Sequence, residues 1–456
     1  MHSLTITFRC HGTAENRARY FLDLFSSITD IRFVPVSINA DLIYGEPRED
    51  EQYRMAIKQV DYVIEQADWA LVDAKSRLIL PSFVSPDLAQ PSGRRLEFDI
   101  FSIMFEFMKT GLLNHGDPFW HPGRFSTTLR YVYPFFDSYI DCLLGALKAS
   151  ALLPQDFSRP SPWPENAEFA VGLSHDIDIF RRKVPGSLVM LAKSVFSDEI
   201  PGGFAGSIRG LADSVTSMLP GVVNPYRQLS KWREIEDAAT YFVFSGKRRS
   251  RKDPKYKPAH VARRLRQVDS KSYEIGLHNG IGTFGDPEHL AAQKQRLAET
   301  FKAEILGIRP HYLDCRYPAF WRSASDFEYA SSVGSDAMPG FTSGINFPFF
   351  GFDFDTAERL DVLELPIGLM DCALFGIEND AVRERSVDTM IKTCRANHGL
   401  LVLDWHNRTA YEPDFPGWFN AYCSILEKAR AEGAYLAPLG QIARWWRKRC
   451  ASVFSS

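Results

Sequence analysis

Between residues 169 and 449, apolar runs of strand length alternate with segments of helical period, and this alternation constrains the fold most. The strand-like runs cover residues 169–177, 239–246, 272–280, 311–320, 360–367 and 399–407. Helical periodicity marks residues 258–270, 287–305 and 440–449, and Pro and Gly break residues 178–232 into expected short helical pieces. Strands that alternate with helices form a parallel sheet covered by helices, either a barrel or a doubly wound sheet.

The first 150 residues have a different pattern, which predicts a smaller α+β domain. Strand-like pieces lie at 4–10, 30–38 and 76–83, and helical periodicity lies at 98–113 and 131–150. A Pro-rich polar stretch, 151–167, then lacks periodicity and is the expected linker. Because 456 residues exceed what one hydrophobic core usually spans, we expect two domains, 1–150 and 168–456.

Composition and charge exclude several classes of protein. The formal net charge is −3 and the sequence pI is about 6.4, which gives no global electrostatic case for nucleic acid. No apolar run reaches the roughly 18 to 20 residues of a membrane-spanning helix, and the N-terminus does not resemble a signal peptide. Seven cysteines without a CxxC pair favour reduced thiols. We therefore expect a cytoplasmic protein without a membrane span.

Polar side chains gather at the ends of the predicted strands. The residues concerned are Asp176, Asp178, His278, Arg316 and His406. The carboxyl ends of parallel strands lie at one edge of a barrel, which is where such folds carry their active sites. Carboxylates, imidazoles and one guanidinium at that edge are typical of metal-assisted hydrolysis.

Asp176 and Asp178 constrain the interpretation most, because their carboxylates are expected to lie close together. Side chains of a strand alternate between its faces, so the two carboxylates point the same way and repel each other unless a cation lies beside them. They could instead cap a strand or open a helix, as aspartates often do. The apolar run before them favours the first interpretation, in which one aspartate binds a divalent cation and the other stays free as a base.

The other three residues each have an ordinary structural alternative. His278, before a glycine-rich turn, is either a half-buried histidine or a metal ligand through its neutral imidazole. Arg316 is either a surface arginine packed on Trp321 or a donor that orients the free aspartate. His406 leaves an apolar strand beside Trp405, where burial and a nearby carboxylate would set the pKa of a general acid.

Six sequence pieces in a fixed order resemble a known family. They are AVGLSHDID, ATYFVF, EIGLH, CRYPAFW, LVLDWH and LAPLGQIARWW, between residues 168 and 448. This order is similar to that of polysaccharide deacetylases of the NodB-homology type, carbohydrate esterase family four. The first part of the chain resembles an uncharacterised domain that precedes a bacterial subgroup of that family. The fold that the resemblance implies is an α/β protein with an incomplete or distorted (β/α) barrel.

The resemblance also implies a role for each matching residue. Asp176 matches the catalytic base and Asp178 and His278 match metal ligands. Arg316 matches the arginine that orients the base, and His406 matches the general acid. The acidic residue of the family's fourth motif corresponds best to Asp371 in LPIGLMDC.

One position departs from the family pattern. The second metal-binding histidine should stand four residues after His278, where this chain has Gly282. His311, His175 or a water molecule could replace it. A regular strand would turn His175 away from Asp178, and His311 is about 16 Å from Arg316 along an extended chain. The choice among the three stays open at this point.

The leading hypothesis is hydrolysis of an N-acetyl or O-acetyl group on an amino sugar or glycan. The resemblance implies a divalent metal ion, zinc first and cobalt, nickel or manganese otherwise, and a backbone N–H near Tyr317 that stabilises the oxyanion. Trp321 and Trp405, with Tyr317, are the expected substrate contacts. The alternatives are a catalytically degenerate carbohydrate-binding protein and a hydrolase of a non-sugar amide.

Overall fold

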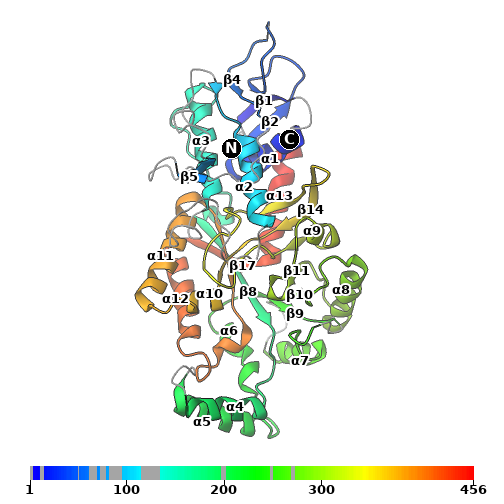
Figure 1. The fold of residues 1–456 in the computed structure, drawn as a ribbon, viewed down its shortest axis with the longest axis vertical. Helices are drawn as coiled ribbons and strands as arrows, with labels where there is room; N and C mark the ends of the chain where they lie inside the picture. The colour runs from blue at the N-terminus through cyan, green and yellow to red at the C-terminus, as the bar shows by residue number, and fades with distance from the viewer. Residues whose placement is uncertain are drawn as a thin grey trace.

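The chain forms two α/β parts stacked along its long axis (Figure 1). The computed structural model describes residues 4–10, 15–49, 51–60, 69–71, 79–81, 95–113, 134–196, 202–246, 250–268 and 273–455. The first part, blue to cyan in Figure 1, lies at the upper end, and the strand–helix repeats lie below it.

The first part contains a five-stranded parallel sheet in the order β2-β1-β3-β4-β7. The strands are β1 (Leu4–Cys10), β2 (Ile31–Pro35), β3 (Leu42–Tyr44), β4 (Met55–Ile57) and β7 (Arg95–Leu96), with a separate pair β5 (Trp69–Leu71) and β6 (Ile79–Pro81). Three helices accompany them, α1 (Glu15–Thr29), α2 (Ile100–Leu113) and α3 (Phe135–Ala149). The strands and helices predicted in this part are present over their described residues, whereas α1, β3, β4, β5 and β7 were not predicted.

The second part is built on a curled ten-stranded sheet. Its strands are β8 (Phe169–Ile177), β9 (Ala239–Val243), β10 (Tyr273–Asn279), β11 (Gly307–Pro310), β12 (Tyr329–Ala330), β13 (Phe349–Asp353), β14 (Glu358–Glu364), β15 (Ile367–Met370), β16 (Leu400–Asp404) and β17 (Ala434–Pro438). Eight run parallel in the order β14-β12-β11-β10-β9-β8-β16-β15, β13 pairs antiparallel with β14, and β17 pairs with β8. The chain passes from β14 to β15, the two ends of the parallel run, without a recorded ladder between them. The expected incomplete barrel is confirmed.

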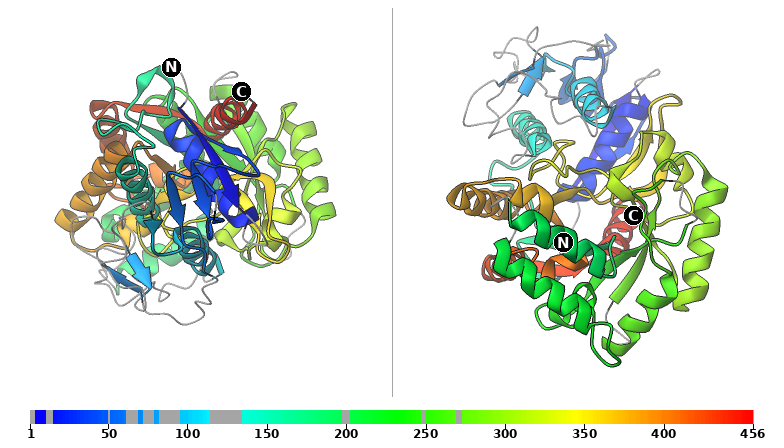
Figure 2. Two further views of the ribbon diagram at one scale, coloured as in Figure 1. Left: turned by 90° about the horizontal axis from the view of Figure 1, so that it is seen from above. Right: turned by 60° about the horizontal axis from the view of Figure 1, so that its bottom comes forward.

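The helices of this part cover the outside of the sheet, apart from α4 and α5, which lie together at its lower end (Figure 1 and Figure 2). They are α4 (Val184–Ser194), α5 (Gly203–Thr216), α6 (Leu229–Arg233), α7 (Pro258–Val268), α8 (Pro287–Phe301), α9 (Ala319–Ser323), α10 (Asp371–Phe375), α11 (Asp380–Asn397), α12 (Trp418–Ala431) and α13 (Leu439–Ser455). Because helices lie against the sheet, all nine residues of β8 are buried, which explains its continuous apolar run.

One predicted strand is wrong. Residues 311–320 do not form a strand: β11 ends at Pro310, and His311–Leu313 turn as a 3₁₀ helix. Pro310 contributes no N–H to a ladder, and Tyr312 and Leu313 have positive φ values of 59° and 49°, which extended backbone does not allow. This boundary moves Arg316 away from the strand end.

The two parts share one continuous hydrophobic core. Helix α1 packs on α13, Tyr20 donates a hydrogen bond to the carbonyl of Phe350 at 2.6 Å, and Arg449 pairs with Asp30 at 2.6 Å. The division into domains at 1–150, 151–167 and 168–456 therefore stays a prediction.

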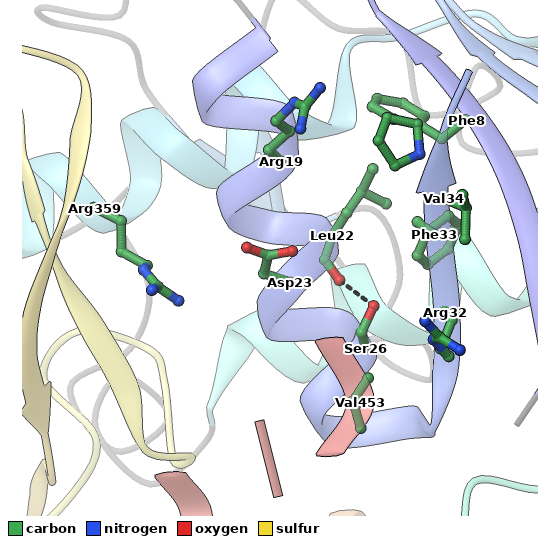
Figure 3. A pocket seen from close by; sticks show the side chains of 11 residues that line it. Phe8, Arg19, Leu22, Asp23, Ser26, Arg32, Phe33, Val34, Arg359 and Val453 are labelled. Atoms are coloured by element: carbon green, nitrogen blue, oxygen red, sulfur yellow. Dashed lines mark hydrogen bonds between the residues drawn. The ribbon is translucent and has the colours of Figure 1, made fainter. Parts of the chain in front are cut away.

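A cavity of about 440 Å³ opens between α1, β2, Arg359 of β14 and Val453 of α13 (Figure 3). It is lined by none of the polar residues predicted to carry the chemistry. No disulfide joins any of the seven cysteines, all of which lie within the described residues. No helix within the described ranges is long and apolar enough to cross a membrane.

Candidate active site

Two pairs of adjacent strands, separated by β9, deliver the polar residues to one end of the barrel. Strand β8 pairs in parallel with β16, with Ser174 opposite Asp404, and β10 pairs with β11, with His278 opposite Arg309. Because these strands run parallel, their carboxyl ends meet. Asp176 and Asp178 point to the same side, as the alternation along β8 predicts, since both carboxylates face His278.

Asp178 stands at the centre of the site, and its two oxygens face different partners. Oδ1 lies 3.2 Å from His278 Nε2 and 3.4 Å from His311 Nε2. Oδ2 lies 3.1 Å from His406 Nε2 and 3.4 Å from Arg408 Nη1. Burial alone would raise the pKa of Asp178, but the imidazoles around it, His406 first, lower the pKa well below its usual value.

Asp178, His278 and His311 fit a divalent metal ion. Each offers one ligand atom, and the three atoms lie within 4.8 Å of one another. A tetrahedral ion with bonds of about 2.0 Å separates its ligands by about 3.3 Å, close to the distances that Asp178 Oδ1 makes to the two rings. One carboxylate and two imidazoles are a donor set that suits zinc.

The surroundings of the two rings are compatible with this fit. His278 Nδ1 donates to the carbonyl of Arg309 at 2.9 Å, which leaves Nε2 as the nitrogen that faces Asp178. Burial would lower the pKa of His278, but the nearby aspartates raise it above its usual value. A proton on Nε2 or a bound divalent ion therefore supplies the positive charge that Asp178 faces. His311 Nδ1 has no hydrogen-bond partner among the described residues, and Asp253 Oδ1 lies 3.7 Å from it.

His311 is thus the candidate for the third metal ligand. The sequence analysis disfavoured it because His311 would lie about 16 Å from Arg316 along an extended chain. That estimate measured along the chain, whereas the relevant neighbour is His278 on the adjacent strand, whose ring centroid lies 5.0 Å from that of His311. Gly282, at the family's histidine position, lies in a turn with φ 72°, and its N–H donates to Asp314.

The guanidinium beside Asp176 belongs to Arg309, which the sequence analysis did not single out. Arg309 is fully buried, and its Nη1 lies 2.9 Å from both Asp176 Oδ1 and Asp404 Oδ1. Burial alone would raise the pKa of Asp176, but Arg309 and the nearby imidazoles lower it below its usual value. Burial raises the pKa of Asp404 to about 7. Asp176 is thus held as the ionised carboxylate of the pair.

Arg316 does not occupy the position expected of it. It lies in the loop after the 3₁₀ turn and is exposed, while the contact to Asp176 that it was expected to make is made by Arg309. A charged residue inside the short apolar strand GIRP was the available signal for Arg309.

His406 is held by Asp371, the residue suggested for the fourth motif. Asp371 Oδ1 accepts a hydrogen bond from His406 Nδ1 at 2.8 Å, and Oδ2 accepts one from the backbone N–H of His406 at 2.7 Å. Burial would lower the pKa of His406, but Asp371 and Asp178 raise it well above its usual value. The ring therefore presents a protonated Nε2 toward Asp178.

His175 faces the opposite side of β8, as expected for a regular strand. Its Nδ1 lies 2.9 Å from the carbonyl of Trp405 and its Nε2 lies 3.0 Å from Glu236 Oε1. Tyr422 also donates to Glu236, at 2.9 Å. His175 is therefore committed to a buried network behind the site and is not a candidate ligand.

The three expected substrate contacts are buried. Trp321 and Trp405 are 0% exposed, and Trp321 donates from its indole N–H to Glu364 at 2.9 Å. Tyr317 donates to Ser332 at 2.9 Å. A ring enclosed on both faces cannot stack on a sugar, so these side chains belong to the core. The backbone N–H near Tyr317 stays a prediction.

Comparison with known proteins gives similarity at the level of weak structural resemblance. No family model matches the chain, and no curated protein matches it. A protein described as a polysaccharide deacetylase from Mycobacterium smegmatis has a TM-score of 0.40 at 17% identity, over 64% of this chain and 94% of that one. A second polysaccharide deacetylase structure, from Pseudomonas aeruginosa PAO1, has a TM-score of 0.41 at 15% identity, over 64% of this chain and 95% of that one. The structure of Puue allantoinase has a TM-score of 0.40 at 14% identity, over 64% of this chain and 95% of that one. Values this low carry no argument about activity, which must rest on the site.

Proposed function

We propose that this protein is a metal-dependent hydrolase that removes an acetyl group from an acetylated amino sugar or glycan. The observation that supports it best is the arrangement of Asp178, His278 and His311 as one donor set. Two further groups lie beside this set: the carboxylate of Asp176, held by Arg309, and the imidazole of His406, held by Asp371. A hydrolase needs these three elements: a cation site, a base and an acid.

Asp178, His278 and His311 would hold the metal ion. A divalent ion in such a site lowers the pKa of bound water and polarises a carbonyl oxygen. Zinc suits the donor set best, and cobalt, nickel or manganese are the alternatives.

Asp176 acts as the general base that takes a proton from the attacking water. The Arg309 guanidinium keeps this carboxylate ionised and fixes its orientation, since it also contacts Ser174 Oγ at 2.9 Å. Ionised carboxylate oxygens accept only, so Asp176 is ready to receive the proton.

His406 acts as the general acid that protonates the departing amine or alcohol. The two hydrogen bonds to Asp371 fix its ring and backbone, and leave Nε2 as the proton donor toward the interior of the site. Base and acid thus approach the reacting centre from opposite sides of Asp178.

The carbohydrate-binding alternative rested on Gly282, which stands where the family has its second metal-binding histidine. His311 completes a donor set of three residues, so the glycine no longer argues against metal binding. The acetylated glycan as substrate and the cytoplasmic location come from the sequence resemblance and composition, and both are part of the proposal.

Acetate release from N-acetylated and O-acetylated oligosaccharides tests the proposal, with metal content measured on the same samples. We expect about one equivalent of metal and release of acetate in the wild type, loss of both in Asp178→Ala, and bound metal without activity in Asp176→Asn. The exposed Asp156→Asn serves as the matched control. Sugar binding without metal would support the degenerate binding protein instead. Metal binding with hydrolysis only of non-sugar amides would assign a different substrate.

A further inference from the structure

A helical hairpin that follows strand β8 carries most of the exposed large hydrophobic side chains among the described residues. Twelve of the fifteen fall between residues 179 and 223. They are Ile179, Leu188, Val189, Val195, Phe196, Phe204, Ile208, Val215, Met218, Leu219, Val222 and Val223. Exposed apolar side chains concentrated on one segment indicate an interaction site, whereas single ones scattered over a surface are ordinary.

The hairpin, residues 179–196 and 202–223 with helices α4 and α5, forms the lower end of the molecule (Figure 1). The N-terminal part lies at the opposite end, and both helices run across the lower end side by side (Figure 2, right). Strand β8 leads directly into the hairpin, so the hairpin lies at the same end of the barrel as Asp176 and Asp178.

The two helices of the hairpin have their polar and apolar faces reversed, compared with a helix on the surface of a globular protein. The buried residues of α5 are Ser207, Gly210 and Ser214, and those of α4 are Ser187 and Ser194. In an aqueous protein the apolar stripe of a helix faces the core and the polar face is outside. Here the inner faces are small and polar, and the outer faces are large and apolar.

A buried arginine holds the inner faces together. Arg182 donates to both oxygens of Asp414 at 2.6 and 2.9 Å, and to Gly210 O at 2.6 Å and Ser214 Oγ at 2.9 Å. A Cβ at Gly210 would lie 2.5 Å from Arg182 Nη2, so only glycine allows this approach. The hairpin is thus stabilised by hydrogen bonds and not by burial of its own apolar side chains.

We propose that this hairpin seats the protein on the surface of a lipid bilayer. Small residues between helices with apolar residues outside are how helices pack in lipid, because lipid offers no drive to bury apolar side chains inward. Ser187 Oγ and Ser214 Oγ lie 2.8 Å apart between α4 and α5 and illustrate this close packing.

The lengths of the helices place them in the interface and not across it. Helix α4 has 11 residues and α5 has 14, or about 16 and 21 Å, whereas the hydrocarbon core is about 30 Å thick. Helices of this kind lie in the plane of the headgroups with one apolar face buried.

Exposed cations flank the apolar face. They are Arg181, Lys183, Lys193 and Arg209. Asp213 is engaged by the hydroxyl of Tyr411 at 2.6 Å, and the connection between the helices carries Asp198 and Glu199, outside the described residues. The cations exceed these acids by one, so apolar contact dominates and anionic headgroups add a modest attraction.

Docking in this way would present the end of the barrel that carries Asp176 and Asp178 to the membrane. If the proposed function holds, the substrate is a glycan carried by a lipid or held at the membrane surface. Only this statement about the substrate rests on the proposed function. Binding to vesicles is measured without any substrate, so its failure is distinct from failure of the hydrolase.

Flotation of the full chain with vesicles tests the proposal. The vesicles are phosphatidylcholine alone and phosphatidylcholine with phosphatidylglycerol. We expect the wild type to float with both and more with the second, and the triple variant Leu188→Gln, Phe196→Gln, Phe204→Gln to partition at least about tenfold more weakly. Glutamine keeps helical propensity, and these side chains are 51%, 89% and 52% exposed, so the fold should persist.

Ile38→Gln is the matched control, since Ile38 is 58% exposed and lies outside the hairpin. It should float like the wild type. A wild type that stays at the bottom of the gradient overturns the proposal, as does a triple variant that floats equally well. A wild-type dimer that becomes monomeric in the triple variant, without vesicle binding by either, would assign the face to a second copy of the chain.

Discussion

His278 and Arg309 face each other in the ladder between β10 and β11, and this pairing organises the candidate site. The carbonyl of Arg309 accepts from His278 Nδ1 at 2.9 Å and so fixes the tautomer of the ligand. The side chain of Arg309 reaches Asp176, and His311 follows two residues later beside His278. One strand register therefore positions a base, two ligands and the cation that orients the base.

Replacing Arg309 should be far more damaging than replacing Arg316. In Arg309→Met, Asp176 and Asp404 lose their shared buried cation, which should cost roughly 3–5 kcal/mol of unfolding free energy. Acetate release should fall by about 10²-fold or more, since the base is no longer ionised and oriented. The midpoint of urea unfolding and the initial rate of acetate release measure both effects.

Arg316→Met is the matched control. Arg316 is exposed, so its replacement should change stability by less than about 0.5 kcal/mol and leave the rate near that of the wild type. If Arg309→Met does not fold, Arg309→Lys keeps the charge and should fold with reduced activity. Equal loss of activity in Arg316→Met would restore the role that the motif order assigned to it.

The sequence predicted the parts of the site that follow from periodicity. The alternation along β8 placed Asp176 and Asp178 on one face and His175 on the other, and strand–helix alternation predicted the parallel sheet. These features depend on local geometry, which a sequence pattern records directly.

The sequence did not predict the parts that depend on where a strand ends and which strand is its neighbour. The run 311–320 was apolar enough to predict a strand, but Pro310 ends β11 before it, so Arg309 and not Arg316 lies beside Asp176. Likewise, apolar residues in 184–219 indicate helices, but only the buried serines and Gly210 show that the apolar faces point outward. Pairing between strands and contacts between helices are tertiary properties.

His311 should be required for metal binding, and His175 should not. His311→Ala removes one of three donors and should weaken the metal affinity by more than the roughly 10–100-fold that loss of an outer partner costs. Competition with a chelator measures each dissociation constant.

His175→Asn is the comparison that distinguishes the two histidines. It should keep the metal affinity of the wild type, because its ring faces Glu236 on the other side of β8. It should instead lower stability by roughly 1–3 kcal/mol, since the buried Glu236 loses one hydrogen bond while Tyr422 keeps its own. Metal loss in His175→Asn with retention in His311→Ala would show the donor set to be misassigned.

Asp371 should act with His406 as one unit. Asp371 accepts the two hydrogen bonds from His406 with different oxygens, whereas the amide of Asp371→Asn has only one oxygen to accept them. The ring of His406 also loses the negative charge that favours its protonated form. We expect kcat to fall by about 10²-fold with KM little changed. His406→Ala should lose at least as much, and the double variant should lose no more than His406→Ala. Independent, multiplying effects would mean that Asp371 acts separately from the acid.

Asp23 should make the stability of the protein depend on pH, away from the active site. It lies on α1 in the cavity of Figure 3, on the side that faces Arg359, and burial raises its pKa from 3.8 to about 6. A raised pKa means that the folded state prefers the protonated carboxyl. The stability that this preference contributes is fully present below pH about 4, and is lost as the pH rises through about 6.

Asp23→Asn cannot ionise and should keep that stability at every pH. The shift corresponds to at most about 3 kcal/mol, and solvent in the open cavity reduces this to about 1–2 kcal/mol. The urea midpoint of Asp23→Asn should therefore exceed that of the wild type at pH about 7.5, and the difference should vanish near pH 4. Asp156→Asn, on the exposed surface, should follow the wild type throughout. A constant difference between Asp23→Asn and the wild type over this range would mean that the amide acts through its hydrogen bonds, and that ionisation of Asp23 has no part in the effect.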